Sequence, residues 1–257
     1  MTVQPHLVER AGVTVVLGDA PAPPDELLAG LPGEPGFRPV VVAVHPGPSA
    51  EELARLLHGR VDGTRLILSY AAVNGIARTL ADRLRVPVVA PTGAALMLPE
   101  RLFVQHGEWV RFRPGAEPVG EGARFPAPRW QAALRHGPAL TPIPAGLWLG
   151  PSGEAVPGDV LTLPVLDERV TVVVGPVPPP EARAALRTLP WPLRHEMLLE
   201  PYGTDPGTVK DIGRRITEGF LPTRTVTRPV PGAAPVAGPA ADKALWRPAG
   251  AWRRTPS

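Results

Sequence analysis

Few residues of this chain have the type and spacing that catalysis requires, and they follow two predicted strands. His45 comes after the apolar run Pro39–Val44, while Ser69 and Tyr70 come after the next run, Leu66–Leu68. Catalytic groups and ligands in open α/β sheets lie outside the carboxyl ends of the strands. If the strands are neighbours, His45 could act as a general base, with Ser69 as nucleophile or Tyr70 as acid. The alternative is structural: His45 only ends a strand and Tyr70 packs against the following helix.

Other catalytic and cofactor motifs are missing from the sequence. The chain has no cysteine, which excludes disulfides, thiolate metal sites and a Cys nucleophile. No serine lies in Gly-x-Ser-x-Gly, and the histidines show no His-Glu-x-x-His or short paired spacing. Neither Gly-x-Gly-x-x-Gly nor a P-loop is present. We therefore expect no metal and no cofactor, although a small-molecule or nucleotide binder at the strand ends near Gly18, His45 and Gly93 stays open.

The C-terminal segment carries the charge of the chain. Residues 214–257 hold eight basic residues against two acidic ones, a net of +6 within a total of +3. Such a segment could contact an acidic protein, nucleic acid or a membrane surface, or be a solvated flexible tail. Two tryptophans lie beside arginines, the residue types most enriched at binding hot spots. The candidate binding residues are Trp246, Arg247, Trp252, Arg253 and Arg254; alternatively, both tryptophans fold back on the core.

Apolar runs and helical patterns alternate through the first half of the chain. This order favours an α/β fold with a mostly parallel sheet flanked by helices. Ser49 with Glu52 forms a capping box in front of the second helix. A β-hairpin is expected from Leu102 to Phe112, turning at His106 and Gly107. The expected strands are Val13–Leu17, Pro39–Val44, Leu66–Leu68 and Val86–Ala90, and the expected helices are Asp25–Leu31, the stretch after Ser49 and Ile76–Leu84.

The strand ending in His-Pro-Gly and the strand ending about 25 residues later resemble the core of caspase-like cysteine peptidases. Residues 38–115 are similar to a segment of large actinobacterial toxin-like proteins, in which a strand ends in Ser-Cys. Its later motifs are matched here by Leu80–Leu84, Val86–Thr92 and Trp109–Gly115. The resemblance implies a caspase-like or Rossmann-like fold. Tyr70 stands where that family has its cysteine, and a phenol with a pKa near 10 cannot replace a thiolate. The resemblance therefore implies a peptidase fold that has lost its activity.

A second unit is predicted by an internal repeat. Val13–Gly18 and Val170–Gly175 differ at one position in six, at an offset of 157 that places His45 on Tyr202. We expect an α/β domain over residues 1–115 and a Pro/Gly-rich linker over 116–144. A shorter, related α/β unit over 145–230 would then include strand pieces near Val160–Leu163 and Thr223–Arg228. A flexible basic tail over 231–257 would complete the chain.

The start of the chain has no signal-peptide pattern, and no apolar stretch approaches the length of a membrane span. A cytoplasmic location is the default expectation. Our leading hypothesis is a non-catalytic protein-interaction or scaffold protein, a pseudoenzyme whose tail docks to a protein partner. Nucleic acid would be contacted only through the basic tail. The competing hypotheses are a hydrolase that uses His45 and Ser69, and a small-molecule or nucleotide binder at the strand ends.

Overall fold

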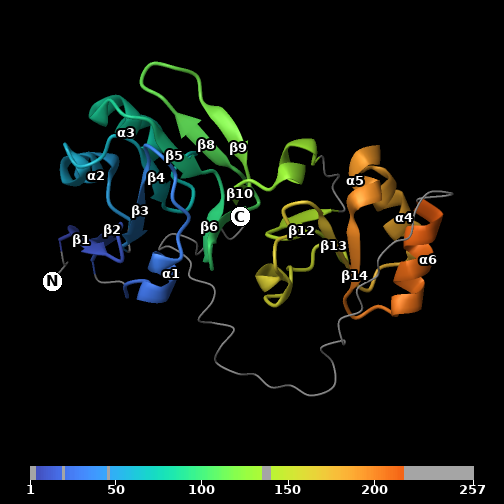
Figure 1. The fold of residues 1–257 in the computed structure, drawn as a ribbon. Helices are drawn as coiled ribbons and strands as arrows, with labels where there is room; N and C mark the ends of the chain where they lie inside the picture. The colour runs from blue at the N-terminus through green and yellow to red at the C-terminus, as the bar shows by residue number, and fades with distance from the viewer. Residues whose placement is uncertain (1–3, 19–20, 45–46, 135–139, 217–257) are drawn as a thin grey trace. The chain divides into compact units, whose positions relative to one another are not determined.

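A computed structural model describes residues 4–18, 21–44, 47–134 and 140–216 of the chain. These residues form an α/β fold with three sheets and six α-helices, as the alternating sequence pattern predicted (Figure 1). They divide into two compact units, unit 1 up to Ala127 and unit 2 from Pro128 on. None of the described helices is long and apolar enough to cross a membrane.

A seven-stranded sheet forms the centre of unit 1. Its strands β2 to β5 are parallel neighbours, and the strands at both edges are antiparallel. The parallel strands are rich in valine and buried on both faces, as the continuous apolar runs require. In sheet order the strands are β1 (His6–Arg10), β2 (Val13–Leu17), β3 (Arg38–Ala43), β4 (Thr64–Ile67), β5 (Val88–Pro91), β8 (Trp109–Phe112) and β9 (Val119–Gly122).

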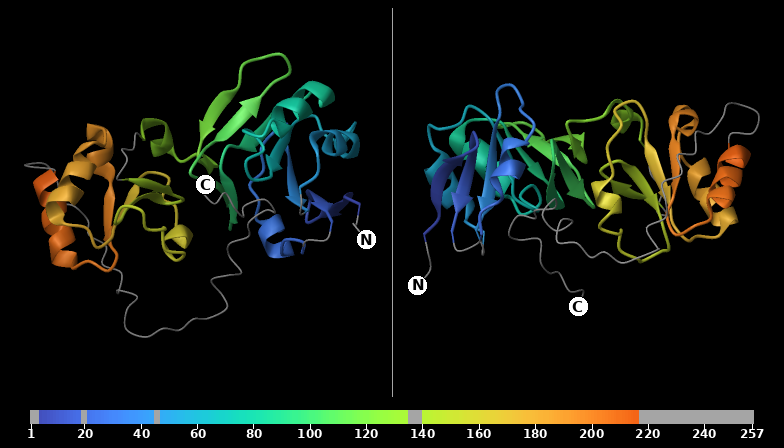
Figure 2. Two further views of the ribbon diagram at one scale, coloured as in Figure 1. Left: turned by 180° about the vertical axis from the view of Figure 1, so that it is seen from behind. Right: turned by 60° about the horizontal axis from the view of Figure 1, so that its bottom comes forward.

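The two faces of this sheet are covered differently. Helices α2 (Ala50–Leu57) and α3 (Ile76–Leu84) pack on one face, and the predicted capping box at Ser49 begins α2. The short helix α1 (Asp25–Ala29) packs on the other face, as Figures 1 and 2 show. Alternation along β3 produces this split, since Val40 and Val42 join the first core and Val41 joins the second. The connections that leave β2 and β3 therefore run to opposite faces.

The predicted hairpin at His106 and Gly107 is wrong. Strand β7 (Arg101–Gln105) pairs with β6 (Ala94–Leu98), whereas β8 pairs with β5 and β9. The four strands form one long bent hairpin, β5–β6 returning as β7–β8, that turns between Leu98 and Arg101. His106, with φ of 56°, and Gly107 lie at the bend of the returning arm, where the chain passes from one sheet to another.

Residues 116–144 contain more structure than a linker. They include β9 and β10 (Arg124–Phe125) of unit 1, and η1 (Arg129–Ala133) and β11 (Thr141–Ile143) of unit 2. β10 pairs with β7 to complete a three-stranded sheet over the α1 face. Proline and glycine predict a linker over these residues, but they lie between short edge strands, where proline is tolerated.

Unit 2 has a four-stranded sheet with helices on one face. Strands β12 (Gly146–Leu149), β13 (Thr171–Val174) and β14 (Leu198–Pro201) are parallel, and β11 is the antiparallel edge. Helices α4 (Pro179–Arg187), α5 (Trp191–Glu196) and α6 (Pro206–Ile216) pack on one face (Figure 1). The expected strand near Val160–Leu163 is a 3₁₀ helix, η2 (Val160–Thr162). The expected strand at Thr223–Arg228 and the tail 231–257 lie outside the described residues.

The two units share a strand–helix–strand order but differ in detail. Thr14 pairs with Val40, 26 residues on, whereas Thr171 pairs with Leu198, 27 residues on. The ungapped offset of 157 thus slips by one residue between the paired strands. In addition, α6 packs on the same face as α4, while α2 lies opposite α1. The structural similarity of the two units is therefore limited to their first strand–helix–strand segments. That the units arose by duplication stays a prediction.

Candidate functional site

Ser69 is the first of the predicted catalytic residues at the end of β4. Its side chain is buried, with the residue only 4% exposed, and its Oγ accepts a hydrogen bond from the backbone N–H of Ala95 at 3.1 Å. This bond joins the end of β4 to the start of β6. A nucleophilic serine must present its hydroxyl to a substrate. The geometry therefore gives Ser69 a structural role in holding the bent hairpin against the sheet.

Tyr70 has the opposite environment. Its backbone is left-handed, with φ of 64°, and the residue is 42% exposed. Its N–H donates to the carbonyl of Gly93 at 3.0 Å, and its own carbonyl accepts from Val73 and Asn74. Val73, at 64% exposed, is the second apolar side chain on this loop. The resulting Tyr70 loop, residues 70–75, presents an aromatic and an aliphatic side chain to solvent on a backbone fixed by hydrogen bonds.

The remaining predicted site residues are outside the described part of the chain. His45 lies in the gap at residues 45–46, and Trp246, Arg247, Trp252, Arg253 and Arg254 lie beyond residue 216. Ser69 and Tyr70 both follow β4, and their relation to His45 stays a prediction.

Two glycines proposed to line a ligand site have packing roles. A Cβ on Gly93 would collide with the carbonyl oxygen of Gln105, at the bend of the long hairpin. A Cβ on Gly18 would lie 2.9 Å from Cγ1 of Val44. Both positions need glycine because backbone or core atoms approach closely, which explains them without a ligand.

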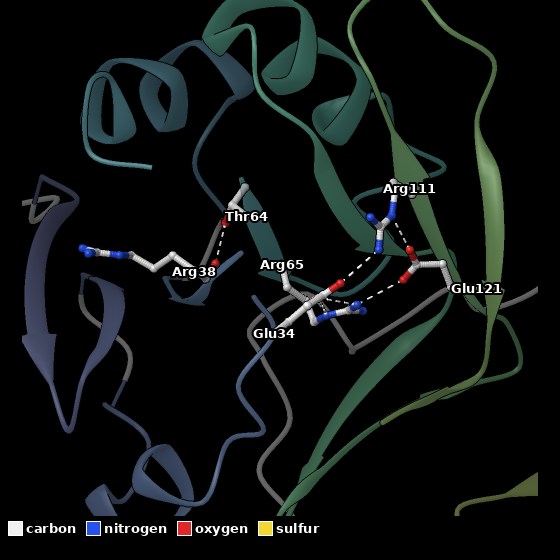
Figure 3. A network of polar contacts seen from close by, with 6 residues as sticks. All are labelled: Glu34, Arg38, Thr64, Arg65, Arg111 and Glu121. Atoms are coloured by element: carbon white, nitrogen blue, oxygen red, sulfur yellow. Dashed lines mark hydrogen bonds and ion pairs between the residues drawn. The ribbon is translucent and has the colours of Figure 1, made fainter. Parts of the chain in front are cut away.

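A ring of four charged residues lies on the α1 face of unit 1, and sequence reasoning missed it (Figure 3). Arg65 on β4 binds Glu34 at 2.7 Å and Glu121 at 3.0 Å. Arg111 on β8 binds Glu34 at 3.0 Å and also pairs with Glu121 on β9. The ring therefore closes through two carboxylates, each shared by both guanidinium groups. It joins the segment before β3 to three strands of the sheet.

Aromatic rings complete the surroundings of these arginines. Arg65 is 3% exposed, and its guanidinium carbon lies 3.7 Å from the ring centroid of Phe125 and 5.1 Å from that of Trp109. Arg111 lies over Phe37 at 4.6 Å. Two positive and two negative charges balance within the ring, and this balance makes a buried arginine tolerable. Arg65 lies just before the predicted strand Leu66–Leu68, so no strand pattern marked it in the sequence.

Another buried arginine lies on the edge strand β10. Burial lowers the pKa of Arg124 to about 9, and its guanidinium lies over the ring of Phe103 at 5.6 Å. Perturbed ionisable groups can mark functional sites, but buried structural cations show the same shift. No group of histidine, aspartate and glutamate residues in the described ranges is arranged to hold a metal ion.

Comparisons of the chain with family models, curated proteins and solved structures found no match.

Proposed function

We propose that the chain is a non-catalytic protein-binding module on an α/β scaffold whose first unit resembles the caspase-like peptidases. The end of β4 carries this proposal. There Ser69 is buried and bonded to the backbone, while Tyr70 faces solvent at the place where the resemblance puts a cysteine. The strand end thus presents a binding side chain in place of a nucleophile.

The Tyr70 loop has the properties of a protein-binding surface. Tyrosine is enriched at binding hot spots, and Val73 adds exposed apolar area beside it in the chain. Hydrogen bonds from Tyr70 to Gly93 and from Ala72 to Pro91 already order the backbone. An ordered loop loses little conformational entropy when it binds, which favours affinity. In the same proposal the Trp/Arg tail makes a second contact with the protein partner, and the module works in the cytoplasm.

Crosslinking from position 70 tests the proposal. The full chain with p-benzoylphenylalanine in place of Tyr70 would be irradiated in a lysate of its own cells, and the captured protein purified. Dissociation constants would then be measured for the wild type, Tyr70→Ala and Val119→Ala, which alters an exposed apolar residue on β9. We expect Tyr70→Ala to weaken binding about 30-fold, a typical hot-spot loss of about 2 kcal/mol. Val119→Ala should bind like the wild type, and equal affinities for all three chains would contradict the proposal.

The hydrolase alternative has a separate test. A serine-reactive fluorophosphonate should leave the wild type unlabelled, because the Ser69 hydroxyl is buried and bonded. Labelling at Ser69 that His45→Ala abolishes would instead establish a serine hydrolase and overturn the proposal.

A further inference from the structure

The carboxyl ends of β12 and β13 in unit 2 meet the topological condition for a ligand crevice. Leu147 and Leu149 face the helices, so Trp148 points to the opposite face of the sheet. The connection after β12 passes through η2 on the Trp148 face, where Asp159 bonds Tyr202, the ring that contacts Trp148. The connection after β13 runs into α4 on the helix face. Crevices form where adjacent strands send their connections to opposite faces.

The indole of Trp148 occupies this crevice. The strands end at Gly150 and Gly175, and a Cβ on Gly175 would lie 2.6 Å from Cη2 of Trp148. A Cβ on Gly150 would collide with the indole nitrogen Nε1. The ring of Tyr202 meets the indole edge-on, with ring centroids 5.5 Å apart. Two glycines and one aromatic edge thus bound a flat space that fits a bicyclic ring.

The indole lacks one interaction in this position. Trp148 is only 3% exposed, and its Nε1–H donates to none of the residues that the structure describes. A buried donor without an acceptor is less stable than the same donor in water. Packing therefore holds the indole in the crevice, while its unpartnered N–H favours a position in which water can reach it.

We propose that this crevice is a binding site for a planar aromatic ring, and that Trp148 is a movable plug that fills it in the unliganded protein. The bound ring lies between Gly150 and Gly175 against the edge of Tyr202. The carboxylate of Asp159 accepts the Tyr202 hydroxyl at 3.1 Å and so fixes the aromatic edge that bounds the site. A ligand that binds only the open form raises the population of that form.

Fluorine NMR of the full chain labelled with 5-fluorotryptophan tests the plug. Trp109, equally buried and also without a described partner for its Nε1, is the matched control within the same molecule. Each signal is assigned from its tryptophan-to-phenylalanine variant. We expect the Trp148 signal to exchange with a solvent-exposed minor state of roughly 0.1–10%. Free indole, the shape that the crevice already holds, should raise that population about tenfold when its concentration is ten times its dissociation constant for the open form. The Trp109 signal should not respond.

Two outcomes of the NMR experiment overturn the proposal. One is a Trp148 signal that shows no exchange or ignores indole, and the other is an equal response of Trp109, which would mean non-specific binding. Gly175→Ala provides an independent check, because its Cβ takes the place of the indole. If Trp148 is a plug, this variant should fold with a solvent-exposed indole, and Gly158→Ala, which meets no atom within 4 Å, should keep it buried. Unfolding of Gly175→Ala, with Gly158→Ala folded, would identify Trp148 as a fixed core residue.

Discussion

Tyr70 keeps a left-handed backbone conformation that costs a side-chain-bearing residue about 1–2 kcal/mol. Such strain persists where the surrounding structure imposes it, and it is concentrated at functional positions. The sequence placed Ser69 and Tyr70 at a strand end because an apolar run stops there. It could not show which side chain is buried, because the left-handed turn at Tyr70 ends the alternation of the strand. The exposure of Tyr70 follows from that turn.

Substitution of Tyr70 by glycine should give a more stable fold than substitution by alanine, although both remove the proposed binding residue. Tyr70→Ala removes the ring and keeps the strain, and Tyr70→Gly removes both. We therefore expect Tyr70→Gly to be about 1 kcal/mol more stable to urea than Tyr70→Ala. Both variants should lose partner binding equally. If the alanine and glycine variants had equal stability, the left-handed conformation would not be a source of strain.

The charged ring depends on residues far apart in the sequence. Arg65 lies 31 residues from Glu34 and 56 from Glu121, while Arg111 lies 77 residues from Glu34. Sequence patterns describe neighbours within one element, so these pairings could not be predicted before the order of the strands was known.

Removal of one carboxylate from this ring should be costly. Glu34→Gln leaves the buried Arg65 guanidinium with less than its full counter-charge, so we expect a loss of about 3–5 kcal/mol in the free energy of unfolding. Glu51→Gln is the matched control, because Glu51 pairs with Arg83 on the surface, where both side chains are more than half exposed. That change should cost under about 1 kcal/mol. Similar urea midpoints for the two variants would show that the ring contributes no more than a surface pair.

At the scale of elements, the bent hairpin is the feature that local patterns could not predict. The His106-Gly107 pair has the composition of a hairpin turn, yet it lies at a bend between two sheets. Strand order decides between these roles, and strand order depends on pairing with β5 and β6, which the local pattern does not contain. By contrast, α3 was predicted with its observed bounds, because the spacing of its apolar residues is a local property.

Gly93 should be sensitive to the smallest side chain. In Gly93→Ala the new Cβ meets the backbone oxygen of Gln105, which cannot move without opening the bend. Overpacking of this kind costs about 1–3 kcal/mol. Gly33→Ala has no atom within 4 Å of its new Cβ, so it should change stability by no more than about 0.5 kcal/mol. Thermal unfolding of the two variants checks this difference, and a stable Gly93→Ala protein would contradict the close approach at the bend.

The hydrogen bond between Tyr202 and Asp159 should make unit 2 sensitive to alkaline pH. Burial, with the charge and hydrogen bond of Asp159, raises the pKa of Tyr202 above its ordinary value near 10. Above pH 10 the unfolded chain then releases this proton before the folded chain does, so stability is lost as the pH rises. Tyr202→Phe should lose less stability between pH 9 and pH 11 than the wild type. In a Tyr70→Phe chain, which retains Tyr202 as its only tyrosine, absorbance at 295 nm follows the phenolate directly. An unshifted titration would contradict the prediction.

At the scale of the whole molecule, the sequence predicted two α/β units but could not define how far they are alike. Val15 and Val172 both face the first helix of their unit, in agreement with the repeat. Helix α6 lies on the same face as α4, and this arrangement depends on the direction of a connection, which strand and helix patterns do not encode. The Pro/Gly-rich stretch after residue 115 has the composition of a linker, because the edge strands in it are short and weakly patterned.

A boundary at residue 127 makes a prediction about folding. Residues 1–127 contain both cores of unit 1 and the complete charged ring, so this fragment should unfold in urea with one cooperative transition. A fragment that ends at residue 115 lacks Glu121 and Phe125, and thus removes a carboxylate and an aromatic ring from Arg65. We expect that shorter fragment to be less stable by at least about 3 kcal/mol, or unfolded. Equal stability of the two fragments would mean that β9 and β10 contribute nothing to the fold of unit 1. If neither fragment folds, unit 1 depends on the rest of the chain.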